Sequence, residues 1–143
     1  MKRSGFKPRT KPMRKRSAKR QAYRASDEGQ AAIVYMGSVK KCPCCVCGHP
    51  APSEAHHCRS DFMPRNDFAT IPLCYECHRG QQGFHAQKST WENINGPDHG
   101  FIKPTMKLVN TILERENNEE TIIDHINGYI NDDTSGASWW TGR

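Results

Sequence analysis

The residues best suited to chemistry lie between positions 42 and 85. This stretch contains all seven cysteines, and residues 53–85 contain four of the seven histidines. The cysteines form two CxxC pairs that together offer four thiolates: Cys44, Cys47, Cys74 and Cys77. Four thiolates complete the tetrahedral shell of a structural zinc ion and leave no open position for a substrate. We therefore expect a zinc ion that stabilises the fold and takes no part in catalysis.

The choice of the first cysteine pair is open, because Cys42 and Cys45 also form a CxxC. We favour Cys44 and Cys47, since Gly48 relieves crowding just after the second ligand. Cys58 is a substitute ligand or a free thiol. Residues 1–30 contain no apolar run of the kind that forms a signal peptide. We therefore interpret the cysteines as metal ligands and not as disulfide partners.

The histidines require a second explanation if the cysteines fill one site. His56 and His57 are adjacent, and neighbouring residues on a strand point to opposite faces. One can therefore hold a metal ion while the other faces a water molecule or a substrate. His78 directly follows a zinc ligand, and His85 lies two helical turns further along if a helix continues that far. Gly80 and Gly83 weaken such a helix.

The positive charge is concentrated at the amino-terminal end. The net charge is +6, and residues 1–24 contain eleven Lys or Arg and no acidic residue. A basic segment with no apolar period is typical of a disordered arm that binds nucleic acid. The arm residues that we expect to bind nucleic acid are Lys7, Arg9, Lys11, Arg14, Lys15, Arg16, Lys19 and Arg20. Arg59, Arg65 and Arg79 lie beside the histidines and could hold phosphates.

The remaining elements must position these groups, and the sequence predicts an α+β fold. Residues 17–36 have a partial helical stripe, "SEAHHC" and "FATIPLC" are strand-like, and the chain should turn helical from Cys74. Two helices are expected after Pro104 and after Asn118. The domain boundaries are a disordered arm (1–24), a domain with flanking helices (25–131, motif 42–85) and a flexible tail (132–143) carrying Trp139 and Trp140. No segment is long and apolar enough to cross a membrane.

The run "AHH", followed by "IPLCYECH" and a further histidine, resembles the HNH (ββα-metal) endonucleases, in the subclass with two CxxC zinc knuckles. The resemblance covers residues 42–85 and implies a small zinc-stapled ββα-metal centre. It implies that His57 is the general base. It also implies that His56, His78 and His85 bind a catalytic divalent ion, with Mg²⁺ or Mn²⁺ expected.

One position departs from the family pattern. Ala69 stands where the family often has an asparagine that orients the base. Asn66 or Asp67 could take over this function, and Asp61 is a further carboxylate nearby. We favour Asp67, because a carboxylate can accept the other imidazole N–H and fix the tautomer.

The residues fit phosphodiester hydrolysis independently of the resemblance. A neutral His57 can take a proton from water near pH 7, and a single divalent ion can neutralise charge on the phosphate and on the leaving oxygen. We expect a 5′-phosphate and a 3′-hydroxyl as products.

The small chain and basic arm are similar to the phage recombination-enhancement nucleases, which cut DNA held in a RecA filament. This likeness implies DNA as a partner, a RecA–DNA filament as a further partner, and the cytoplasm of a bacterial host as the location. The alternative from a different class is a noncatalytic zinc-stabilised protein that binds nucleic acid.

Overall fold

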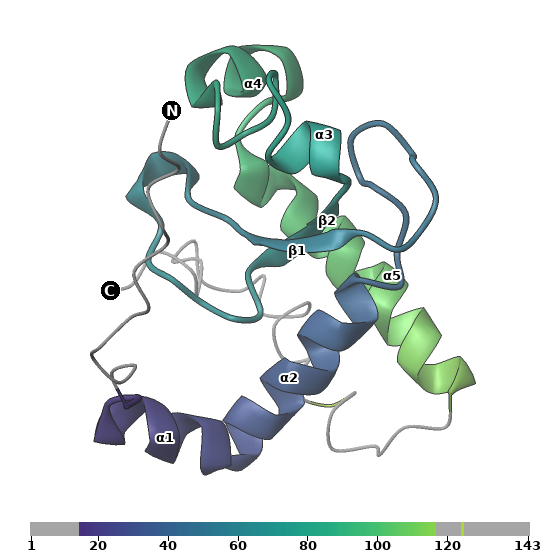
Figure 1. Ribbon diagram of the computed structural model, residues 1–143. Coiled ribbons are helices and arrows are strands. Elements are labelled where there is room, and N and C mark those ends of the chain that lie inside the picture. Colours follow the sequence, from purple (N-terminus) through teal and green to yellow (C-terminus); the bar gives the residue numbers. More distant parts are fainter. Residues whose placement is uncertain (1–14, 117–123, 125–143) are drawn as a thin grey trace, which may run out of the picture.

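A computed structural model describes residues 15–116 and residue 124 (Figure 1). Its described part is α+β, with five α-helices and a two-stranded sheet. The strands are β1 (Glu54–His57) and β2 (Thr70–Leu73). The helices are α1 (Ala18–Ala25), α2 (Asp27–Val39), α3 (Tyr75–His78), α4 (Lys88–Asn95) and α5 (Ile102–Arg115), with short 3-10 turns η1 (Ser60–Phe62) and η2 (Asp98–Phe101).

The two strands form an antiparallel hairpin that carries the histidine pair. His56 lies opposite Ile71 and His57 lies opposite Thr70. The strand β2 is buried along its whole length, whereas only His56 is buried in β1. The short helix α3 follows β2 directly, as the sequence predicts from Cys74 onward. The order strand, strand, helix therefore brings "AHH" and "CYECH" together.

The core lies between the hairpin and the helices α2 and α5, which cross beside it in Figure 1. Tyr35 from α2 is fully buried, and its hydroxyl donates to the carbonyl of Thr70 (3.4 Å). The predicted apolar face of α5, made of Met106, Val109 and Leu113, is buried here as well. Burial of these apolar side chains holds the hairpin against the two helices.

The segment 17–36 forms two helices where the sequence analysis expects one. Ser26 ends α1 through its N–H, which donates to the carbonyls of Ala22 and Tyr23, and its Oγ caps α2 by accepting from Gly29 N–H (3.1 Å). A β-carbon on Gly29 would lie 1.9 Å from the Tyr23 carbonyl oxygen, so the two helices meet too closely for any side chain there. Serine capping and this close approach together explain the break.

The basic arm differs from its predicted extent. The sequence assigns residues 1–24 to a disordered arm, but residues from Ala18 onward are helical in α1. Ser17 caps this helix by accepting from Arg20 N–H (3.3 Å), and Arg24 lies in its last turn, where a positive charge is favourable.

Several predictions fall beyond the described residues. They are the arm residues Lys7, Arg9, Lys11 and Arg14, the helix expected after Asn118, and the tail with Trp139 and Trp140. Among the residues that are described, no helix is long and apolar enough to cross a membrane.

Candidate functional site

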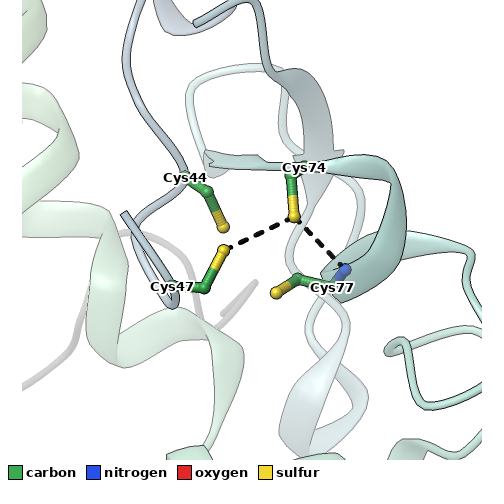
Figure 2. Close-up of side chains that lie close together, drawn as sticks. All are labelled: Cys44, Cys47, Cys74 and Cys77. Atoms are coloured by element: carbon green, nitrogen blue, oxygen red, sulfur yellow. Dashed lines mark hydrogen bonds between the residues drawn. The ribbon is translucent and has the colours of Figure 1, made fainter. Parts of the chain in front are cut away.

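Four cysteine side chains converge between the loop before β1 and the start of α3 (Figure 2). We call them the cysteine cluster: Cys44, Cys47, Cys74 and Cys77. One sulfur atom from each lies within 4.8 Å of the others, and the Sγ atoms of Cys47 and Cys74 are 3.6 Å apart. Two thiolates bound to one tetrahedral zinc at about 2.3 Å lie roughly 3.8 Å apart. The cluster is therefore compatible with a structural zinc ion, as the sequence predicts.

Tight turns position both halves of the cysteine cluster. Gly48 adopts a positive φ of 72°, and its N–H donates to the Cys44 carbonyl, which closes the first turn. Cys45 N–H donates to the carbonyl of Pro72, so this turn is fixed to β2. Cys74 caps α3 with its sulfur, which accepts from Cys77 N–H (3.5 Å). These local bonds orient the sulfurs toward a common point.

The thiol of Cys44 is already disposed to ionise. Burial raises its pKa, but hydrogen bonds from the backbone amides of Cys47, Cys74 and Val46 outweigh burial and bring the pKa to about 7. Metals bind the thiolate form, so a low pKa favours binding. Burial raises the pKa of the cluster residues Cys74 and Cys77, and it also raises the pKa of Cys42 to about 11 and that of Cys45 to about 12. Cys42, Cys45 and Cys58 lie outside the cluster.

Three histidines form a second group, which we call the histidine trio: His56, His78 and His85. One ring nitrogen from each lies within 4.8 Å of the others, and the Nε2 atoms of His78 and His85 are 3.0 Å apart. Two nitrogens that bind one ion at about 2.1 Å lie roughly 3 Å apart. The trio thus has the spacing of metal ligands, and it contains the three residues that the sequence analysis proposed.

The chain brings His85 back to His78 by a turn and not by a continued helix. The helix α3 ends at His78, and the backbone N–H groups of Phe84 and His85 donate to the carbonyls of Cys77 and His78. A β-carbon on Gly83 would lie 2.8 Å from the Glu76 carbonyl oxygen. Only glycine therefore allows the chain to pack so closely against α3.

Two members of the trio donate a ring N–H to a carboxylate. His56 donates Nε2–H to Asp98 Oδ2 (3.0 Å), and His78 donates Nδ1–H to Glu54 Oε2 (2.6 Å). Asp98 also accepts from the backbone N–H groups of Arg59 (2.7 Å) and Ser60 (3.0 Å). A carboxylate behind an imidazole is the usual outer partner of a metal-binding histidine. The sequence analysis identified neither carboxylate.

The electrostatics favour neutral imidazoles at two members of the trio. Burial lowers the pKa of His78, although Glu54 opposes this effect. Burial and the neighbouring His78 lower the pKa of His85. Asp98 is held ionised: burial raises its pKa, but hydrogen bonds from His56, Arg59 and Ser60 outweigh burial and bring it to about 2. Neutral rings with anchored N–H groups present lone pairs to a cation.

His57 lies on the other face of β1 from His56 and has its own carboxylate. It donates Nε2–H to Asp67 Oδ1 (2.8 Å), and both side chains are partly exposed. This bond fixes the tautomer and leaves Nδ1 as a proton acceptor. Asn66 has a different bond, because its Oδ1 accepts from Phe68 N–H (2.9 Å), and Asp61 lies against His99 (2.6 Å). The structure therefore pairs His57 with the favoured candidate.

The cationic residues near the trio differ in what they contact. Arg79 forms an ion pair with Glu54, which also holds His78. Arg65 Nε lies 3.8 Å from Asp67 Oδ1, and the side chain of Arg59 is exposed. Four arm residues within the described range are exposed: Lys15, Arg16, Lys19 and Arg20.

Comparison with known proteins gives a family match. A family model described as "Protein of unknown function (DUF968)" matches residues 19–112, which include the cysteine cluster and the histidine trio. No curated protein and no solved structure matches the chain.

Proposed function

Because the chain belongs to the DUF968 family, whose function is unknown, we propose an activity from the site itself: metal-dependent endonucleolytic hydrolysis of DNA phosphodiester bonds, of the HNH type. The observation that supports this proposal is that two adjacent histidines of β1 have different surroundings. His56 joins a trio with metal-ligand spacing, while the next residue, His57, is paired with Asp67. A site that binds a metal and orients a base at adjacent positions suits hydrolysis.

The metal assignment follows from the donor atoms. We propose that the cysteine cluster holds zinc permanently, because four soft thiolates match zinc and complete its shell. The histidine trio supplies three nitrogens, which leaves positions open on an octahedral or tetrahedral ion. Imidazole nitrogens bind Mn²⁺, Ni²⁺ or Zn²⁺ better than Mg²⁺, so of the expected ions Mn²⁺ suits the trio better than Mg²⁺. A divalent ion bound there would neutralise charge on the phosphate and on the leaving oxygen.

The protein's own residues supply the proton transfer. With its Nε2–H held by Asp67, His57 takes the proton of an attacking water on Nδ1. Asp67 stabilises the imidazolium that forms and prevents the ring from rotating. Asp98 and Glu54 fix the rings of His56 and His78 in the same way, so the site is ordered before a substrate arrives.

The experiment that tests the activity is nicking of supercoiled plasmid with Mg²⁺ or Mn²⁺ by wild-type protein, His57→Ala and His49→Ala. His49 is exposed and lies outside the trio, so its substitution is the matched control. We expect His57→Ala to lose about 10²–10⁴-fold in rate, the usual contribution of general-base catalysis. No cleavage by wild-type protein would leave the noncatalytic nucleic-acid-binding alternative, and equal cleavage rates for the two variants would show that His57 is not the base.

We further propose that the reaction belongs to phage or prophage DNA recombination, with a RecA–DNA filament as the partner. The support is the likeness of the basic arm and the "IPLCYECH" run to the phage recombination nucleases. Cleavage measured with naked DNA and with DNA in a RecA filament tests this assignment. A rate that does not rise with the filament would contradict it.

A further inference from the structure

A cleft of about 420 Å³ lies between the basic helix α1 and the loop that carries Asp67. One wall consists of Arg20, Tyr23 and Arg24 from α1, with Glu28 from the start of α2. The opposite wall consists of the loop residues Arg65, Asn66 and Asp67. We call this feature the α1 cleft. Its volume lies in the range of small-ligand pockets.

The charge of the α1 cleft favours an anionic ligand. Arginine side chains line both walls, and guanidinium groups bind phosphate with paired hydrogen bonds. The two acids have different surroundings: Asp67 is already bonded to His57, whereas Glu28 is exposed. An anion between the walls would contact Arg20 or Arg24 on one side and Arg65 on the other.

The remaining lining suits more than a phosphate group. Tyr23 provides an aromatic surface, and aromatic side chains stack on nucleobases whatever their sequence. The Oδ1 of Asn66 accepts from Phe68 N–H, so its amide NH₂ is the donor left for a ligand. The Glu28 carboxylate can accept from an exocyclic amino group of a base. Arginine, tyrosine, amide and carboxylate together match a nucleotide.

The position of the cleft links it to the proposed chemistry. Asp67 belongs both to the cleft wall and to the pair with His57, and Arg65 lies 3.8 Å from the same carboxylate oxygen. A nucleotide in the cleft would therefore lie beside Asp67, whose carboxylate is bonded to the proposed general base His57. The next phosphate along the strand would then meet His57.

We propose that the α1 cleft binds one nucleotide of the substrate strand. Its base leaves the neighbouring bases and stacks on the Tyr23 ring, and its phosphate lies between the arginines of the two walls. This assignment rests on the proposed nuclease function, because it takes the ligand to be that enzyme's substrate strand. It makes α1 and the 65–67 loop a subsite that places the scissile phosphate beside His57.

The test is binding of a short fluorescein-labelled single-stranded DNA, followed by anisotropy at several salt concentrations. The full-length protein carries His57→Ala throughout so that the probe is not cut, and no Mg²⁺ or Mn²⁺ is added. Arg20→Ala/Arg24→Ala removes two charges from the cleft. Lys107→Ala/Arg115→Ala removes two charges from exposed positions of α5, outside the cleft, and is the matched control.

Because one phosphate on a single strand contributes about 0.7 to the salt slope of log K, we expect the cleft variant to lower that slope by about 0.7 and the α5 variant to leave it unchanged. Arg65→Ala should weaken binding as well, and its effect should be non-additive with Arg20→Ala/Arg24→Ala if one phosphate contacts both walls. Equal losses for the cleft and α5 variants would overturn the subsite. Strict additivity would overturn a shared phosphate.

Tyr23 separates a nucleotide subsite from a merely basic surface, because its substitution changes no charge. Tyr23→Leu should weaken binding by roughly 5- to 100-fold with the salt slope unchanged, and Tyr23→Phe should restore binding. Circular dichroism of each variant confirms that α1 is intact. Unchanged affinity for folded Tyr23→Leu would overturn the base contact.

The outcome for the cleft is independent of the outcome for catalysis. If wild-type protein cuts DNA while the cleft variants bind like the control, the nuclease proposal stands and the subsite fails. If wild-type protein does not cut DNA but the cleft variants lose affinity as expected, the cleft binds a strand and the nuclease proposal fails.

Discussion

The cysteine cluster and the histidine trio are both spaced for a metal ion, yet they are built in different ways. The cluster gathers four thiols from two tight turns, and its sulfur atoms form hydrogen bonds with backbone amides and with one another. The trio gathers three imidazoles from a strand, a helix and a turn, and carboxylates orient two of them. The first arrangement fills a coordination shell, whereas the second leaves it open.

The two arrangements suit different functions within one small domain. A metal ion bound by four thiolates has no free coordination position, and the free energy of binding the ion adds to the free energy of folding. A shell of three imidazoles binds more weakly and needs outer carboxylates to hold its geometry. Substitutions in the two groups should therefore have different consequences.

The largest effect is expected in the cysteine cluster. Cys77→Ser removes one thiolate from a four-ligand shell, and the small core depends on that shell, so cooperative unfolding should be lost. Metal analysis of purified wild-type protein should find one zinc per chain, and the variant should have less. Cys45→Ser is the control, because Cys45 neighbours the cluster without belonging to it. Zinc loss in Cys45→Ser as well would assign the metal to the pair Cys42 and Cys45, and zinc retention in Cys77→Ser would contradict a zinc ion held by Cys74 and Cys77.

The next effect separates a metal ligand from a base. His78→Ala should lower cleavage strongly at low metal concentration, and added Mn²⁺ should restore part of the rate because the ligand set is only weakened. His57→Ala should not respond to added metal, because it lacks the proton acceptor. Cleavage rates across a Mn²⁺ titration measure the contrast. The opposite pattern of rescue would exchange the two functions.

A smaller effect is expected at Asp98, which supports the trio and the backbone at once. Asp98→Asn replaces a carboxylate that accepts three hydrogen bonds with an amide that has one acceptor oxygen. The free energy of unfolding should fall by about 2–4 kcal/mol, measured by urea denaturation. Asn110→Ala, at a half-buried position of α5, provides a comparison. An unchanged urea midpoint would show that these bonds contribute nothing net.

The smallest effect is expected at Glu54, the carboxylate behind His78. Glu54→Gln keeps the shape of the side chain but removes its charge, and metal affinity of the trio should fall by roughly 10- to 100-fold. Isothermal titration with Mn²⁺ measures it, with Glu114→Gln on α5 as the control. Zinc content should stay at the wild-type value, since Glu54 does not belong to the cysteine cluster. Similar affinities for both variants would deny Glu54 an orienting function.

The sequence predicted which cysteines and histidines lie together better than it predicted the carboxylates that contact them. The cysteine pairs have a diagnostic spacing, and the adjacent His56 and His57 follow from strand alternation. Asp98 gave no such signal, because it reaches His56 from a part of the chain far downstream, where no periodicity marks it. Glu54 stood two residues before His56 on the same strand, and the period-two rule could have suggested it.

The helical segment at 17–36 had a readable signal that was missed. Ser26 is followed by Asp27 and Glu28, which is the pattern of a helix start, and so the boundary between α1 and α2 was encoded locally. No local sequence pattern reveals the close approach at Gly29, because this contact depends on how the two helices meet. The α1 cleft arises from that meeting and was therefore not predicted.

The placement of Asp98 after both ligand groups also sets an order in time. A chain emerges from the ribosome amino-terminal end first, so Cys77 leaves before Asp98. The thiols can capture their ion and fasten the hairpin while His56 still lacks the carboxylate that anchors its ring. The residues of the cysteine cluster are thus complete first, and His56 of the histidine trio gains its carboxylate partner only when synthesis has passed η2.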